Sequence, residues 1–391
     1  MLTRATVTHA AASTTLDVAM LRRRALWAML ATKVVGGWGL GWDIRWHLSI
    51  GRDSFWIPPH LMTYAAVAAL AIVSLGVLVL ETWTARGARR PGTLSVAGLA
   101  GTRGFHLAWW GIALTILAAP IDDLWHRLFG LDVTLWSPPH LLGLAGAQIN
   151  TLGVLLIALE CWPATARARA IALGAGGVLL LWAFQVLMDQ GVQTAYRHGG
   201  VLFFTWPILG SLAFTFALVL MARLWPWRAA PVVITVGAVL MQASMILVAD
   251  LGFAVVRPVS ALSETIAADP SSPVAVAHEM GRLNGTVPGR SLMLRLFAVL
   301  PAVMLAAVDA RRRWPAVSLA FGAALFVVSS VMLSRSPALR QVVPSVTAVA
   351  WGAGLALLAA LAGGAAGAGL ARRLMAAASA LAAPGTAAGR R

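Results

Sequence analysis

Charged residues and cysteine are both scarce in this chain. Only 11% of its 391 residues are charged, whereas a soluble domain carries about 25%. Hydrophobic residues make up 59%, which excludes both a disordered chain and a water-soluble globule of this size. The single cysteine, Cys161, excludes a disulfide framework and any metal site built on a cysteine cluster.

Repeated apolar runs are the main feature that the sequence does contain. Each run is about 20 residues long, the length that spans a bilayer as a helix, and none shows the alternation of a transmembrane β-barrel. We therefore expect an all-α protein, a polytopic transmembrane helical bundle of about ten spans. The expected spans are 25–47, 58–81, 104–126, 138–160, 170–188, 200–221, 230–250, 291–309, 315–334 and 343–371.

The arginines predict the topology. The net charge is +16, but we see no basic face interleaved with aromatic residues, so we expect no nucleic-acid partner. If ten spans alternate, most arginines fall on one side, which the positive-inside rule makes the cytoplasm. Both termini are then cytoplasmic, the first span is uncleaved, and loops 48–57 and 127–137 face outward. These cytoplasmic arginines are Arg22–Arg24, Arg86, Arg89, Arg90, Arg103, Arg167, Arg169, Arg223, Arg228, Arg311–Arg313, Arg372 and Arg373.

The chain divides into four expected parts. Residues 1–24 form a cytoplasmic N-terminal segment, 25–165 a four-span region, 166–373 a six-span region, and 374–391 a flexible tail rich in Ala and Gly. Residues 251–290, inside the six-span region, lack a continuous apolar run and form an exterior loop. The pair His278 and Glu279 in this loop is weak evidence for a metal, and a solvated surface pair explains it better.

An internal repeat carries the candidate chemistry. Residues 42–61 and 122–141 each contain an Asp, a His four residues later, a Trp, two prolines and a second His. The spacing is x3 and x12 in the first copy and x3 and x13 in the second. Four of the eight histidines of the chain lie in these copies. The six candidate ligands are Asp43, His47 and His60, and Asp122, His126 and His140.

The spacing predicts how these residues meet. Asp43 and His47, at i and i+4, lie on one face of a helix end. Pro58 and Pro59 suit the first turn of the next helix, which places His60 opposite that pair. Two imidazoles and a carboxylate suit copper, iron or zinc and leave coordination positions open. We therefore predict a metal at each hairpin, because ionisable groups at membrane depth are costly and usually functional.

Metal-free interpretations of the same residues remain. Histidines near a membrane interface are often hydrogen-bonded interfacial residues, and Asp–His pairs can cap a helix without a metal. Tryptophans at this depth are typical of an interfacial belt, or they wall off a reactive metal. Asp53 and Asp132 recur after the first His and are candidates to hydrogen-bond the ligands, or else they pair with a loop arginine such as Arg52.

The first hairpin resembles the metal-binding segment of the C subunit of the particulate methane/ammonia monooxygenases, the copper membrane monooxygenases. The resemblance covers about 140 residues, from the first span to the fourth, and implies that Asp43, His47 and His60 bind copper and form the catalytic site. The second hairpin is similar to the second copper segment of that family. There, Asp122 replaces an Asn, which adds negative charge. The residues that carry the first resemblance are Asp43, Trp46, His47, Arg52, Asp53, Pro58 and His60.

The resemblance also implies a setting. We expect a multi-pass protein of a bacterial-type inner membrane whose metal hairpins face the periplasm. Its partners would be other membrane subunits, and it would oxidise a small substrate, such as a hydrocarbon or ammonia, with O2. The family has more chain before its first site, and nothing beyond the fourth span of this chain matches it.

Other functions fit parts of the pattern. A metal carrier or transporter would need polar groups that continue across the bilayer. Lys33, Gln148 and Asn150 lie within the first and fourth spans, but no chain of carboxylates, methionine pairs or cysteine crosses the bilayer. A haem electron carrier would have no use for the repeated carboxylate. An accessory structural subunit is a further alternative. In the C-terminal half, Asp189, Tyr196, Arg197 and His198 form an exterior polar cluster, and Arg295 falls within a span.

Overall fold

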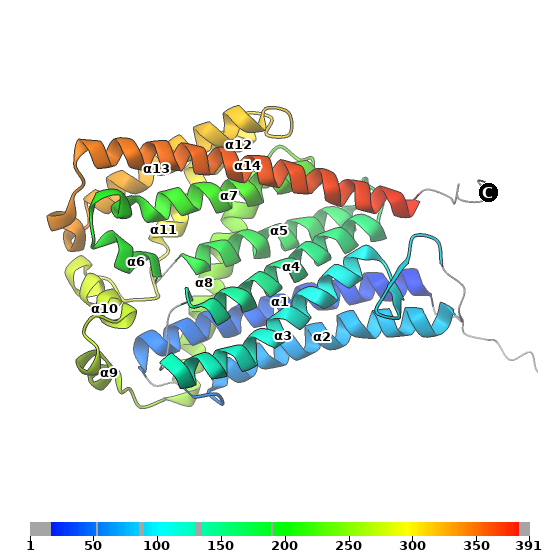
Figure 1. Cartoon of the computed structure of the whole chain (residues 1–391), viewed down its shortest axis with the longest axis horizontal. Helices are drawn as coiled ribbons and strands as arrows, with labels where there is room; N and C mark the ends of the chain where they lie inside the picture. The colour runs from blue at the N-terminus through cyan, green and yellow to red at the C-terminus, as the bar shows by residue number, and fades with distance from the viewer. Residues whose placement is uncertain (1–16, 52–53, 86–89, 130–134, 189–190, 383–391) are drawn as a thin grey trace, which may run out of the picture.

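The computed structural model describes residues 17–51, 54–85, 90–129, 135–188 and 191–382. Within these residues, helices run side by side along a common direction, and one short β-hairpin is added at an end of the bundle (Figure 1). The helices are α1 (Val18–Ser49), α2 (Pro58–Ala85), α3 (Arg103–Phe129), α4 (Pro138–Cys161), α5 (Arg167–Leu187), α6 (Gly191–Tyr196), η1 (Gly200–Phe204), α7 (Thr205–Leu224), α8 (Ala230–Val256), α9 (Leu262–Ala268), α10 (Pro273–Asn284), α11 (Met293–Leu296), α12 (Val299–Ala307), α13 (Trp314–Ser334), η2 (Pro337–Val342) and α14 (Val346–Ala382).

Eight helical segments in the described part of the chain are long and apolar enough to cross a membrane. They are α2, α3, α4, α5, η1 with α7, α8, α13 and α14. The prediction of a helical, multi-pass membrane protein is therefore confirmed at this level. Each of the eight overlaps one of the ten expected spans.

The other two expected spans differ from the prediction. Helix α1 has 32 residues, enough to cross a bilayer, but it is not among these eight apolar segments, and it contains Lys33, Asp43 and Arg45. The expected span 291–309 is not one helix but two short ones, α11 and α12. Pro301 lies in the first turn of α12, where it cannot donate a backbone hydrogen bond to the Phe297 carbonyl, so α11 and α12 do not join into one helix.

The connections between helices gather at two opposite ends of the bundle (Figure 1). One end holds α6, α9 and α10, together with the turns from α1 to α2 and from α3 to α4. The other end holds β1 (Leu94–Val96) and β2 (Leu99–Gly101), an antiparallel pair in which Ser95 is opposite Ala100. The sequence did not predict this hairpin. A hydrogen bond of 2.7 Å from the Ala100 backbone nitrogen to Thr82 Oγ1 attaches the hairpin to α2.

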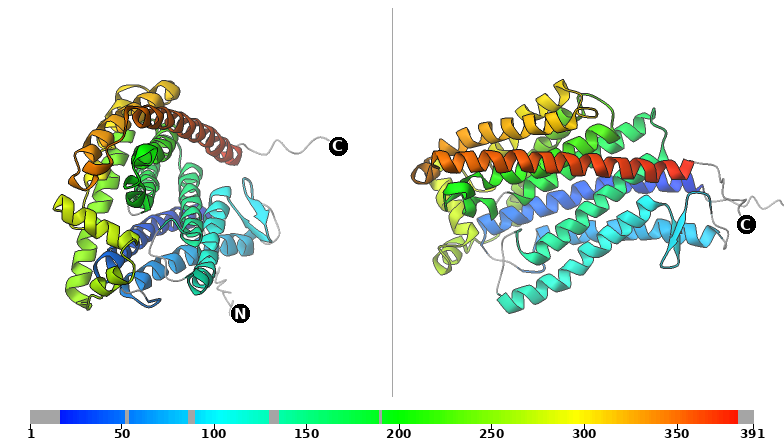
Figure 2. Two further views of the ribbon diagram at one scale, coloured as in Figure 1. Left: turned by 60° about the vertical axis from the view of Figure 1, so that its left-hand side comes forward. Right: turned by 45° about the horizontal axis from the view of Figure 1, so that its top comes forward.

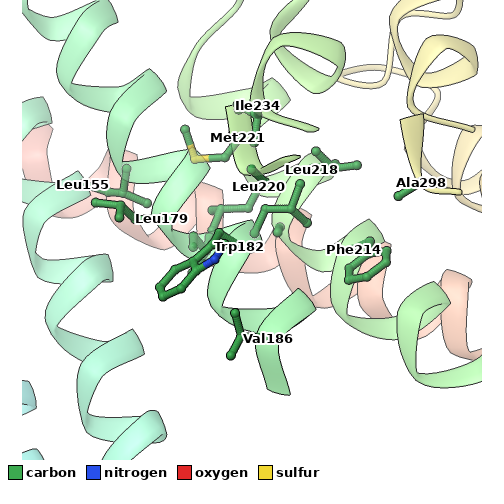
Figure 3. Packing of buried hydrophobic residues seen from close by; sticks show 14 of the residues in the cluster. Leu155, Leu179, Trp182, Val186, Phe214, Leu218, Leu220, Met221, Ile234 and Ala298 are labelled. Carbon is green, nitrogen blue, oxygen red and sulfur yellow. The ribbon is translucent and has the colours of Figure 1, made fainter. Parts of the chain in front are cut away.

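One continuous apolar core joins the first four long helices to the rest of the chain. Leu155 of α4, Leu179 and Trp182 of α5, and Phe214 of α7 belong to this core (Figure 3). Leu155 and Leu179 lie side by side in this view, as expected of a close-packed interior. The core therefore includes side chains from both helix pairs that carry the candidate ligands, α1 with α2 and α3 with α4.

The C-terminal helix is longer than the sequence predicted. Helix α14 runs beside α7 along the length of the bundle (Figure 2) and ends at Ala382. Residues 374–382, expected as part of a flexible tail, are therefore helical, and 383–391 lie outside the described residues. The stretch is rich in alanine, the strongest helix former, which explains the extension.

Candidate metal centres

The hairpins that carry the candidate ligands are built on close helix contacts. A Cβ atom added to Gly39 of α1 would lie 3.0 Å from the Thr63 backbone nitrogen of α2. A Cβ atom added to Gly146 of α4 would lie 2.6 Å from the Thr115 backbone nitrogen of α3. Small residues allow such approach between membrane helices, and it brings the side chains of each pair within reach of one another.

The first cluster joins the end of α1 to the start of α2. Asp43 and His47 lie one helical turn apart near the end of α1, and His60 lies in the first turn of α2. Asp43 Oδ1 is 3.5 Å from His47 Nε2 and 3.0 Å from His60 Nε2. Both imidazoles therefore turn the same nitrogen toward one carboxylate oxygen.

The second cluster has the same arrangement between α3 and α4. Asp122 Oδ2 is 3.3 Å from His126 Nε2, and Asp122 Oδ1 is 3.5 Å from His140 Nε2. The two imidazole centroids are 6.3 Å apart, as they are in the first cluster. Pro138 and Pro139 open α4 as Pro58 and Pro59 open α2, where the sequence predicted them.

The hydrogen bond at His60 Nδ1 indicates that the first cluster needs a cation between His60 and Asp43. Nδ1 lies 3.0 Å from the backbone carbonyl oxygen of Ser54, which can only accept a hydrogen bond, so Nδ1 carries the proton. Neutral His60 then turns the lone pair of Nε2 toward the negative Asp43 oxygen. That contact is repulsive unless a cation lies between the two atoms, either a proton on Nε2 or a metal ion. A backbone carbonyl on Nδ1 is also the usual support of a metal-binding histidine.

The distances between ligand atoms fit a transition metal. A metal about 2.0 to 2.1 Å from each ligand holds tetrahedral neighbours about 3.3 Å apart. The Asp–His separations are 3.0 and 3.5 Å in one cluster and 3.3 and 3.5 Å in the other. In both groups, one ligand atom from each of the three residues lies within 4.8 Å of the other two. Each group could therefore hold an ion on one face and leave the opposite face open.

Aromatic side chains and an ion pair pack the outer side of α1 against α8. Trp46 stacks on Phe253 with ring centroids 5.9 Å apart, and Trp42 meets the same ring edge-on. Arg45 is buried, with its guanidinium 2.6 Å from Asp250. Trp46 is therefore part of a buried aromatic cluster beside the first site, whereas Trp56 and Trp136 are exposed.

The segment between α8 and α11 caps the end of α1. His278 Nε2 lies 2.6 Å from the Leu48 carbonyl oxygen, and Thr265 Oγ1 donates to the Gly51 carbonyl at 2.8 Å. Ser260 Oγ and the Ala261 backbone nitrogen donate to the two carbonyls between them, at 2.8 and 2.7 Å. Carbonyls at a helix C-terminus have no hydrogen-bond partner within the helix. This segment supplies those partners at the end of α1, which carries Asp43 and His47.

Several residues singled out from the sequence lie elsewhere. Arg52, Asp53, Asp132 and Asp189 are outside the described residues. Glu279 pairs with Arg282 at 2.7 Å, and the guanidinium holds the pKa of that carboxyl below its usual range. Within the described chain, His278 and Glu279 belong to no group of three possible metal ligands. Tyr196 is buried, Arg197 and His198 are exposed, and Arg295 is buried in α11.

Sequence reasoning missed a group of buried charges at the opposite end of the bundle. Glu81 of α2 is buried and accepts a hydrogen bond of 2.7 Å from Arg22 Nε of α1. Glu160 of α4 accepts hydrogen bonds from Thr102 Oγ1 and from the Gly104 backbone nitrogen, at 2.5 and 3.0 Å. The available signal was a carboxylate inside an apolar run, which rarely occurs without a partner.

No known protein family, no curated protein sequence and no solved structure matches the chain.

Proposed function

We propose that the chain binds two metal ions, one at each hairpin, as an integral membrane subunit of an oxidoreductase. The observation that carries the proposal is the convergence, twice in one chain, of two Nε2 atoms on a single carboxylate. Hydrogen-bonded interfacial histidines would have no reason to share one acidic partner in the same geometry at both hairpins.

Copper is the metal we propose, with iron and zinc as alternatives. Two imidazoles and a carboxylate form a set that all three metals accept, and the open face is typical of catalytic rather than structural sites. Copper is preferred because the spacing of Asp43, His47 and His60 resembles that of the copper membrane monooxygenases. Copper or iron would supply the redox chemistry toward O2.

The residues have separate roles in this proposal. Asp43, His47 and His60 bind the catalytic metal, and Asp122, His126 and His140 bind the second ion. The Ser54 carbonyl orients His60 by holding its Nδ1 proton. Trp46 and Phe253 keep water from the outer side of the first site.

The setting follows from the helices and the arginines. We propose a bacterial-type inner membrane, with both termini in the cytoplasm and the two hairpins at the periplasmic face. The substrate would be small and apolar or ammonia-like. Leu124, Leu128 and Phe129 on α3 are more than half exposed, which supports contact with lipid or with another membrane subunit of the complex.

Metal analysis of the full chain tests the proposal. Protein purified from membranes without chelator is expected to hold two metal ions per chain by mass spectrometry. The double variant His47→Ala, His126→Ala should hold none, and His198→Ala, an exposed histidine outside both clusters, should hold two. Equal metal content in all three proteins would reject both sites.

Oxygen uptake tests the oxidoreductase assignment separately. Membranes that contain the chain and its partners are expected to consume O2 when a small hydrocarbon or ammonia is added, and the double variant should abolish this uptake. Metal binding without any substrate-dependent uptake would favour a metal carrier.

A further inference from the structure

A cavity of about 290 Å³ lies among α1 to α5, behind the second cluster. Its walls are mostly apolar, and Leu70, Ile112 and Trp182 contribute to them. Asp122 and His140 line it as well, and so does Lys33 of α1. A volume near 300 Å³ is at the lower limit for a cavity that holds a small organic ligand.

Lys33 is the only lysine in the sequence, and its side chain is directed at α4. Nζ donates to Asn150 Oδ1 at 2.8 Å and to the Ala147 carbonyl oxygen at 3.3 Å. The Asn150 amide cannot turn away, because its Nδ2 donates to the Ala108 carbonyl at 2.8 Å. Both acceptors of Nζ are neutral, and no carboxylate of the described chain forms an ion pair with it.

The threonines and the glutamine of the wall already donate to partners within the protein. Thr63, Thr115 and Thr151 donate to backbone carbonyls at 2.9 to 3.1 Å, and Gln148 donates to the Leu180 carbonyl at 3.1 Å. An ammonium group has three hydrogens to donate, and the described residues accept two. A charged lysine at membrane depth without a counter-ion is costly, so an anionic ligand in the cavity would stabilise the ammonium form of Lys33.

We propose that the cavity binds a linear monocarboxylate of about eight carbons, with its carboxylate on Lys33 and its alkyl chain directed toward His140. An anionic head supplies both the missing acceptor and the missing charge. The alkyl chain then covers the apolar wall. The binding requires no metal ion, so it does not rest on the proposed function.

The length of the ligand follows from α4. Ala147, at the Lys33 end, is seven residues beyond His140, which corresponds to about 10 Å at about 1.5 Å per residue. C–C bonds of about 1.5 Å advance a zigzag chain by about 1.3 Å each, so about eight carbons span that distance.

Equilibrium titration of the purified full-length protein tests the proposal, with octanoate and 1-octanol as ligands of equal chain length. Octanoate should bind at least tenfold more tightly than 1-octanol. Lys33→Met should remove that advantage and leave 1-octanol binding unchanged, whereas Lys33→Arg, which keeps the charge, should retain it. Octanoate that binds no better than 1-octanol, or equally well to Lys33→Met, would overturn the proposal.

Chain length tests the direction of the ligand. Gly143 lines the cavity one turn from His140, and a Cβ atom there would meet only Ala118, at 3.5 Å. Gly143→Leu should therefore shift the preferred acid from octanoate to hexanoate, and an unchanged preference would place the alkyl chain elsewhere. The titrations are run after chelator treatment as well, so loss of the metal assignment alone would leave these results standing.

Discussion

His60 Nε2 lies 3.0 Å from Asp43 Oδ1, across the turn that joins α1 to α2. The same ring is held on its other side by the Ser54 carbonyl, so both nitrogens are committed. The Ser54 carbonyl orients this ring before any metal arrives, which lowers the entropic cost of binding.

Replacing His60 with alanine is expected to remove one of the two metal ions. Asp43 and His47 remain, but two ligands on one helix turn bind far more weakly than three. Mass spectrometry of the purified variant should find one ion per chain, with the second centre still loaded. Two ions in His60→Ala would show that this imidazole is not a ligand.

Asp122→Asn should keep the second ion. The amide oxygen can replace one carboxylate oxygen, and the arrangement of His126 and His140 is unaffected. The affinity of the second site for its metal ion should fall because a negative charge is lost, while the protein should still hold two ions per chain. Metal titration of Asp122→Asn against Asp122→Ala measures this, and equal loss in both variants would show that the charge itself is required.

Gly146→Leu should damage the second centre selectively. The new side chain would meet the Thr115 backbone 2.6 Å from its Cβ atom, so α3 and α4 must separate. Overpacking of this kind costs about 1 to 3 kcal/mol and moves Asp122 away from His140. The variant should hold one ion, at the first centre, and loss of both ions would point to general unfolding.

Glu81→Gln should destabilise the fold without affecting either centre. Its carboxylate is buried against Arg22, and removing one partner of a buried ion pair costs about 3 to 5 kcal/mol. Thermal unfolding in detergent should show a lower midpoint with two ions still bound. The double variant Arg22→Met, Glu81→Leu should recover much of the loss, since no unpaired charge remains.

The sequence could predict the elements that depend on local pattern. Apolar runs gave the long helices, and the i, i+4 spacing with paired prolines placed His60 opposite Asp43. The structure brings the six candidate ligands into two groups, as that spacing indicated. Whether an ion occupies them remains a prediction.

The features that sequence could not predict depend on contacts between distant segments. The Ser54 carbonyl has no side-chain signal, and Lys33 becomes informative only once α4 is seen to offer it neutral partners. The β-hairpin depends on its hydrogen bond to Thr82 of α2. The helix and strand propensities of individual residues do not encode these contacts.

The cap over α1 has a mechanical consequence. Residues 260–278 form hydrogen bonds to four successive backbone carbonyls, from Leu48 to Gly51. These bonds couple the helix end that bears Asp43 and His47 to α9 and α10. A protein that binds those two short helices would therefore also change the geometry of Asp43, His47 and His60.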